Sequence, residues 1–248
     1  MFRNSRHERK LLAPAIFMFL GLTVSVTGQV RMPPGRAPQR AAILQYMSGE
    51  VSVAPSASNQ WTAARLNQPL TAAQYVWTAT NSRAEINVGD GFIRMSSEAS
   101  LTIVALSPSN VQVGVNQGEV SLTVFRLPPG EIYEIDTPNA TLTVTKTGVY
   151  RFVVKPEEEQ TLVTTRKGSI VATGRGPAVT INSGQQVSFL NGNSLQHTAQ
   201  KAPPPDGFED WASVRDKRLG ASRPPFVIGY GPWPYGAIAV PGPPPPPY

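Results

Sequence analysis

A glycine-led phrase that recurs along the chain constrains its fold more than any other feature. In its fullest form, Val111–Val124, two short runs of alternating apolar and polar residues meet at Gln117-Gly118. Shorter versions stand at residues 48–53 (SGEVSV) and 167–171 (KGSIV). Alternation with a period of two is typical of strands with one buried face, and a glycine between two such runs favours a turn. We therefore interpret the phrase as a strand–turn–strand unit that the chain uses repeatedly.

Residues 41–198 carry the same pattern throughout. In residues 83–88, for example, Ala84, Ile86 and Val88 share one face and polar residues take the other, as in a half-buried strand. Short runs rich in Val, Ile and Thr recur with turn signals about every 8–12 residues. The pattern predicts an all-β domain of many short antiparallel strands, forming an irregular β-solenoid or a sandwich. The uneven spacing of the glycine-led phrases disfavours a strict solenoid repeat.

The N-terminal region has the layout of an export signal. Residues 1–28 combine a basic start, an apolar run of about 16 residues and small residues before Gln29. That run is shorter than the roughly 20 residues of a membrane-spanning helix. We expect a cleaved signal peptide, no stable transmembrane span after cleavage, and a periplasmic or secreted protein; an uncleaved anchor is the alternative. The proline-rich residues 29–40 predict a disordered spacer.

Residues 199–220 predict a linker followed by one short C-terminal helix. Asp206 is placed to cap the helix, and Glu209 three residues later completes the pattern of a capping box. Phe208 and Trp211 fall on one face of this helix. We expect these two aromatic residues to hold the helix against the β domain.

Residues 221–248 place aromatic residues between glycines and prolines, and five consecutive prolines stand near the end. This composition predicts a disordered proline-rich tail with polyproline II structure, which aromatic grooves of partner proteins bind. The candidate partner-binding residues in the tail are Tyr230, Trp233 and Tyr235. A tail that serves only as a spacer is the alternative.

Composition excludes several classes of site. The chain has no cysteine, which removes disulfides, thiolate metal sites and cysteine nucleophiles. Its two histidines are His7 and His197, and His7 lies in the expected signal peptide, so a histidine triad or a two-histidine zinc site is not expected. The net charge of +6 belongs partly to the N-terminus, and the remaining charges are scattered, which disfavours nucleic acid as a partner. We expect no metal site, no cofactor and no enzymatic activity.

Two groups of residues in the body are candidate sites. Trp61 and Trp77 have side chains suited to stacking on sugars, although a tryptophan within a strand is more often part of the core. Glu131, Glu134 and Asp136 form the tightest acidic group, and paired carboxylates serve glycoside hydrolysis when they flank a cleft. Glu134 and Asp136 share strand parity beside a Pro-Pro-Gly turn, which favours a solvated face.

Three further groups favour ordinary structural roles. Asp90 precedes a glycine and is interpreted as a turn residue, because no oxygen-rich loop with calcium-ligand spacing follows it. Arg166 and Lys167 suit a phosphate contact but also suit an exposed strand end. Glu157–Glu159 forms a charged loop.

A series of weak motifs stands in a particular order along the body. It includes Gln117–Val120, Ile135–Pro138, Gly148–Phe152, Arg166–Gly168 and Ser183–Val187. The series resembles the FecR domain, the periplasmic domain of bacterial iron-dicitrate sensor regulators and of many exported proteins. The resemblance covers about residues 41–198. In the regulators, a cytoplasmic N-terminal segment contacts a sigma factor, whereas only residues 1–10 precede the apolar run here, so sigma-factor control is not carried over.

The resemblance and the composition together lead to an expected function. We expect a non-catalytic exported FecR-like domain protein that acts as an interaction or scaffold module of the cell envelope. Its partner would be an envelope protein or a cell-wall polymer, reached through open sheet edges and the proline-rich tail. The alternatives are a regulatory or sensory partner in envelope signal transduction, as FecR-type regulators are, and a carbohydrate-binding accessory protein.

Overall fold

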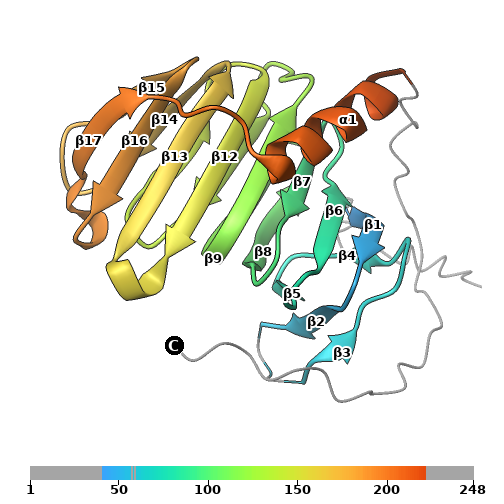
Figure 1. Cartoon of the computed structure of the whole chain (residues 1–248). Coiled ribbons are helices and arrows are strands. Elements are labelled where there is room, and N and C mark those ends of the chain that lie inside the picture. The colour runs from blue at the N-terminus through green and yellow to red at the C-terminus, as the bar shows by residue number, and fades with distance from the viewer. Residues whose placement is uncertain (1–40, 57, 59, 222–248) are drawn as a thin grey trace, which may run out of the picture. The chain divides into compact units, whose positions relative to one another are not determined.

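The computed structural model describes residues 41–56, 58 and 60–221, and within them the chain is built almost entirely of strands (Figure 1). These residues form 17 strands, one α-helix and two short 3₁₀ helices. The strands make two sheets that share the long strand β9 (Asn110–Val124). Strand pairing is antiparallel except between β9 and β10 (Ile132–Asp136), which run parallel. The expected all-β class is confirmed, and the two sheets enclose one core in the manner of a sandwich that is not closed into a barrel.

The two sheets are named here by their strands. In spatial order, sheet A consists of β4 (Pro69–Leu70), β1 (Ala42–Ser48), β6 (Arg83–Asn87), β7 (Gly91–Met95), the C-terminal half of β9, β12 (Gly148–Lys155), β13 (Gln160–Lys167), β16 (Gln185–Leu190) and β17 (Gln196–Lys201). Sheet B consists of β3 (Thr62–Ala63), β2 (Val51–Pro55), β5 (Gln74–Thr78), β8 (Ser100–Ser107), the N-terminal half of β9, β10, β11 (Thr141–Val144), β14 (Ser169–Thr173) and β15 (Val179–Asn182). The 3₁₀ helices are η1 (Pro156–Glu158) and η2 (Gly192–Ser194), and the helix is α1 (Gly207–Ala221).

The glycine-led phrases mark the places where the chain changes from one sheet to the other. Gly49 lies between β1 of sheet A and β2 of sheet B, and Gly168 lies between β13 of sheet A and β14 of sheet B. Gly118 lies inside β9, which passes from sheet B to sheet A without a break, so the turn expected at Gln117-Gly118 is wrong. The three glycines have φ of 75°, 91° and 80°, and a Cβ atom at each would come closer than 3.0 Å to a neighbouring atom. Glycine is required at these positions for its backbone freedom and for its size.

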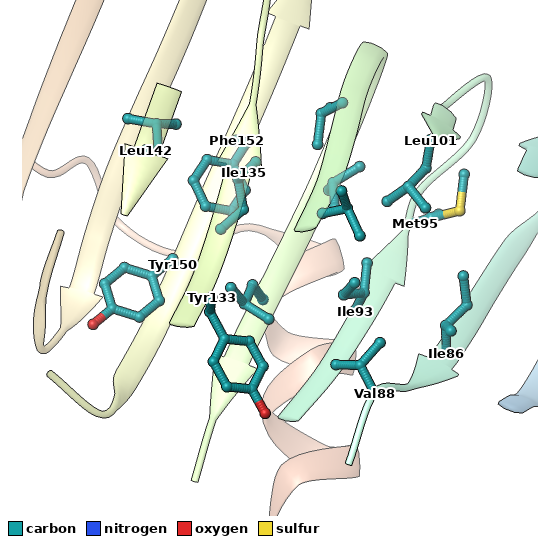
Figure 2. Packing of buried hydrophobic residues seen from close by; sticks show 14 of the residues in the cluster. Ile86, Val88, Ile93, Met95, Leu101, Tyr133, Ile135, Leu142, Tyr150 and Phe152 are labelled. Atoms are coloured by element: carbon teal, nitrogen blue, oxygen red, sulfur yellow. The ribbon is translucent and has the colours of Figure 1, made fainter. Parts of the chain in front are cut away.

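The hydrophobic core lies between the two sheets (Figure 2). It follows the period of two along each strand: Ala84 and Ile86 of β6 point inward, as do Tyr150 and Phe152 of β12. Sheet B supplies the facing layer, which includes Leu101 of β8. The alternation seen in the sequence therefore identified the inward-facing residues of these strands correctly.

Tyr150 joins this core to the crossing at Gly168. Its hydroxyl group contacts the carbonyl oxygen of Lys146 and lies 3.1 Å from the carbonyl oxygen of Ser169. The same hydroxyl accepts a hydrogen bond from the Ser169 N–H at 3.1 Å. Burial raises the pKa of Tyr150 to about 12. The phenol thus supplies hydrogen-bond partners to backbone groups at a buried crossing between the two sheets.

Replacing Tyr150 by Phe is expected to lower the free energy of unfolding by about 1–3 kcal/mol, because a buried backbone N–H loses its partner. Urea unfolding measures this change, and Tyr75→Phe, at a half-buried ring on the outer face, serves as the control with a smaller effect.

The raised pKa of Tyr150 allows a second test, based on pH. The pKa of a tyrosine is about 10 in the unfolded chain and about 12 for Tyr150 in the folded protein. The free energy of unfolding therefore falls as pH rises from about 10 towards 12, because the unfolded chain loses this proton first. Tyr150→Phe should lack that part of the alkaline loss, and an identical loss in both proteins would contradict the assignment.

Helix α1 lies across the outer face of sheet A (Figure 1). The Asp206 carboxylate caps it as predicted, accepting hydrogen bonds from the N–H groups of Phe208 at 3.0 Å and Glu209 at 3.1 Å. Glu209 does not close the expected capping box, because its carboxylate pairs with arginines of the sheet instead. Phe208 is buried, and the Trp211 ring packs between Phe208 and Tyr46, which confirms that these aromatic residues hold the helix against the β domain.

Candidate functional site

Two networks of charged side chains join α1 to sheet A, and the first of them is largely buried. Arg94 of β7 donates to the Glu85 carboxylate of β6 at 2.7 Å, and neither side chain is exposed to solvent. From the helix, Arg215 donates twice to the same carboxylate at 2.7 and 2.8 Å, and Asp216 pairs with Arg94 at 2.7 Å. Thr123 of β9 accepts from Arg94 and donates to Asp216. Two arginines and two carboxylates thus balance one another beneath the helix.

A second network holds the beginning of the helix. Arg151 of β12 pairs with Glu119 at 2.5 Å and with Asp206 at 2.6 Å, and Arg166 of β13 pairs with Glu209 at 2.6 Å. Burial raises the pKa of Glu119 above its ordinary value, against the opposing effect of Arg151, and the hydrogen bond to Glu209 raises the pKa of Arg166. The ion pairs, together with the Trp211 contacts, set the position of α1 on the sheet.

The edge of sheet A at β17 has a different character. All six residues of Gln196–Lys201 are exposed, and among the described residues β17 pairs with β16 alone. Natural edge strands are usually protected by proline, bulges or several charges, because an unpaired row of N–H and C=O groups templates another strand. Within β17 the only lysine or arginine is Lys201 at the end, and proline is absent. We call Gln196–Lys201 the β17 edge.

The two candidate tryptophans lie on sheet B. Trp77 is only 8% exposed. Its neighbour Val76 points into the core, and successive residues of a strand point to opposite faces, so the Trp77 ring lies on the outer face with its register partners Ser52 and Ser100. Trp77 is therefore buried, as expected of a core tryptophan, but its side chain does not point into the core between the sheets. Trp61 is half-buried, and its ring lies 6.3 Å from that of Tyr75 with an interplanar angle of 26°.

The acidic group on β10 is also on the outer face of sheet B. Asp136 accepts hydrogen bonds from Gln112 at 2.8 Å and Thr141 at 2.9 Å. Burial, with a smaller contribution from the charge of Asp136, raises the pKa of Glu134. The two carboxylates lie on the same face, as their parity predicted, and both are half-buried rather than fully solvated. Glu131 precedes the strand.

The remaining candidates take structural roles. Asp90 is in the turn between β6 and β7 and forms an ion pair with Arg126 at 3.1 Å. Arg166 belongs to the second network, whereas Lys167 is exposed at the end of β13. Glu157–Glu159 is exposed at η1. Three predicted partner-binding residues lie outside the described residues: Tyr230, Trp233 and Tyr235.

The described part of the chain has neither a cluster of metal-ligating side chains nor a helix that could cross a membrane. Its histidine and carboxylate side chains do not gather in groups of three or more that would hold a metal ion. Its one helix lacks the length and apolarity for a membrane crossing. The sequence did not predict which residues of the sheet pair with α1. Glu85 and Arg215, for example, are 130 residues apart, so no short stretch of sequence contains both.

The central part of the chain is similar to a known protein family. Residues 74–171 match the model of the FecR protein family. Two crystal structures of a candidate anti-sigma factor from Parabacteroides distasonis are similar to this chain over 56% of its length, at 14% sequence identity and with TM-scores of 0.45 and 0.46. The chain spans 63% and 64% of those chains, less than two thirds of their length. No curated protein matches.

Proposed function

We propose, on the premise that residues 74–171 form a FecR domain, that the chain is a non-catalytic exported module that binds a protein partner in envelope regulation. The match to the FecR family supports a regulatory signalling role. The scaffold and the regulatory roles share one physical requirement, which is a surface that another protein recognises. The proposal has no catalytic step and no cofactor.

The observation that carries the proposal is the β17 edge. A partner segment in extended conformation would continue sheet A there through backbone hydrogen bonds, the mode of recognition known as strand addition. The neighbouring strand β16 is paired along its whole length with β17, so the edge is already held straight. A preorganised edge reduces the entropy lost when a partner binds.

The position of the edge in the chain also supports a regulatory role. β17 is followed directly by residues 202–206 and by α1, which the two charged networks hold on the same sheet. A partner strand on β17 would therefore lie next to the segment that leads into the helix. The proposal therefore links binding at the edge to the placement of α1 through residues 202–206, which join the two elements.

Lysines introduced at the edge test the proposal. Thr198→Lys/Ala199→Lys is expected to reduce capture of the partner from envelope extracts of the host about tenfold or more, equivalent to 1.4 kcal/mol, because edge lysines oppose strand pairing. Leu66→Lys/Val214→Lys adds the same charge at exposed apolar positions away from the edge and should leave capture unchanged. Equal capture by the edge variant and the wild-type protein, both folded, would overturn the proposal.

A further inference from the structure

The outer face of sheet B carries a pair of aromatic rings set around a small residue. In register, Ala54 of β2 pairs with Tyr75 of β5, and Trp61 immediately precedes β3 on the other side of β2. Ala54 is buried beneath its neighbours, and the planes of the Trp61 and Tyr75 rings differ by only 26°. Both rings keep part of their surface exposed. The small alanine side chain leaves room above β2 for the two nearly parallel rings to stack.

Polar side chains continue this face across the neighbouring strands. The register that begins at Ala54 and Tyr75 continues through Thr102, Gly114 and Asp136. At a strand spacing of ~4.8 Å, the row from β3 to β10 is roughly 24 Å long. Gly114 has no side chain, and the side chains of Thr102 and Asn116 lie beside it, at 3.5 Å from the position of a Cβ atom.

The amides beside this row are fixed by hydrogen bonds. Asn116 donates to Thr102 Oγ1 at 2.8 Å, and Gln112 donates to Asp136 at 2.8 Å. Each amide group uses one of its polar atoms in these bonds and has further donor or acceptor capacity. The row thus presents oriented amide and hydroxyl groups next to two partly exposed aromatic rings.

The charges on this face restrict its ligand. Along the described strands of sheet B, the outward positions carry two acidic residues, Glu134 and Asp136, and no lysine or arginine. Acidic polymers and nucleic acids would be repelled, because their charge would have no cation to meet. A neutral ligand with one apolar face and many hydroxyl groups is complementary to such a surface.

We propose that the outer face of sheet B binds a neutral polysaccharide, with Trp61 and Tyr75 as its stacking platform. Sugar rings present C–H groups on their faces, which pack on aromatic rings, and hydroxyl groups at their edges, which bond to amides and hydroxyls. The chain of sugars would run along the row from Trp61 towards Asp136. This site is on the opposite sheet from the β17 edge, so loss of either leaves the other intact.

Retention on neutral polysaccharides tests the inference. The full chain is passed over insoluble cellulose, insoluble chitin and a gel containing mixed-linkage β-glucan, at low and at high salt. We expect retention on at least one of them that salt does not abolish, and roughly tenfold weaker binding for Trp61→Ala/Tyr75→Ala. Tyr46→Ala, at a ring beneath α1, is the aromatic control and should bind normally.

A second variant guards against effects on folding. Thr102→Arg places a long side chain across the middle of the row while leaving both rings in place, and it should also weaken retention roughly tenfold. Thermal unfolding checks that each variant is folded. Failure of the folded wild-type protein to bind any of the three polysaccharides would overturn the inference, as would binding that high salt removes or that survives in both variants.

Discussion

Replacement of Arg94 by alanine is expected to lower the free energy of unfolding by about 3–5 kcal/mol, the range observed when one partner of a buried ion pair is removed. Arg94 lies between Glu85 and Asp216, and the Glu85 side chain has no exposure to solvent. Without Arg94, two carboxylates remain beneath α1 with Arg215 as their only cation in that network. Chemical denaturation followed by tryptophan fluorescence and circular dichroism measures the change.

A surface ion pair provides the comparison for this prediction. Arg126 pairs with Asp90 at 3.1 Å, but its side chain is 65% exposed, so Arg126→Ala should change stability little. If both arginine variants had similar stabilities, the network under α1 would not have the buried, balanced character assigned to it. Glu85→Ala should resemble Arg94→Ala, because it leaves two arginines facing each other without their shared carboxylate.

Replacement of Gly168 by alanine is the second large effect, and it is expected to lower the free energy of unfolding by about 2–5 kcal/mol. The residue has a φ of 91°, which costs an alanine roughly 1–2 kcal/mol. The added Cβ atom would lie 2.2 Å from the Tyr150 hydroxyl oxygen and 2.6 Å from the Thr147 carbonyl oxygen. Moving the Tyr150 hydroxyl disturbs its hydrogen bonds to Ser169, and shifting backbone at a packed crossing adds a further 1–3 kcal/mol, roughly.

Gly184 separates the two parts of that cost. Its φ of 80° is nearly the same, but a Cβ atom there would meet no heavy atom within 4 Å. Gly184→Ala should therefore lose only the backbone part, about 1–2 kcal/mol. A loss at Gly168 no greater than the loss at Gly184 would contradict the role of the close approach to Tyr150, and denaturant unfolding of both variants decides it.

Period-two alternation was sufficient to predict most strands and their inward faces, because one side of each strand meets the core. It misjudged the other side of β6, where Glu85 was grouped with the polar residues of a half-buried strand yet has no solvent exposure. The reason is that α1, which lies much later in the sequence, covers that face, and Arg215 supplies the opposite charge 130 residues away from Glu85. A face covered by a distant charged segment has the same local sequence as a face in water.

The glycine-led phrases illustrate a second limit of sequence reasoning. Their recurrence marked places where the chain passes from one sheet to the other, which were predicted as turns because a turn between paired strands and a crossing between sheets need the same positive φ. Which of the two occurs depends on where the following strand finds its partners, as at Gly118, where β9 continues into sheet A beside β7 and β12. Pairings of that kind join residues far apart in the sequence.

The candidate sites were predicted in part. The sequence named Trp61 and the acidic residues of β10 but did not place them on one face, since that requires the register from β2 through β9 to β10. The β17 edge was expected only in the general sense of an open sheet edge. Its identity follows from the strand order, which places Gln196–Lys201 at the end of sheet A.

The most direct test of the proposed function is site-specific crosslinking of the full chain in its host. A photoreactive amino acid is placed at Thr198 on the β17 edge or, as the control, at Val214 on α1, both of which are exposed. The proposal predicts a discrete adduct with one envelope protein from position 198, its disappearance when Ala199 is changed to lysine, and no such adduct from position 214. The absence of any adduct at Thr198 from folded, exported protein would contradict the account.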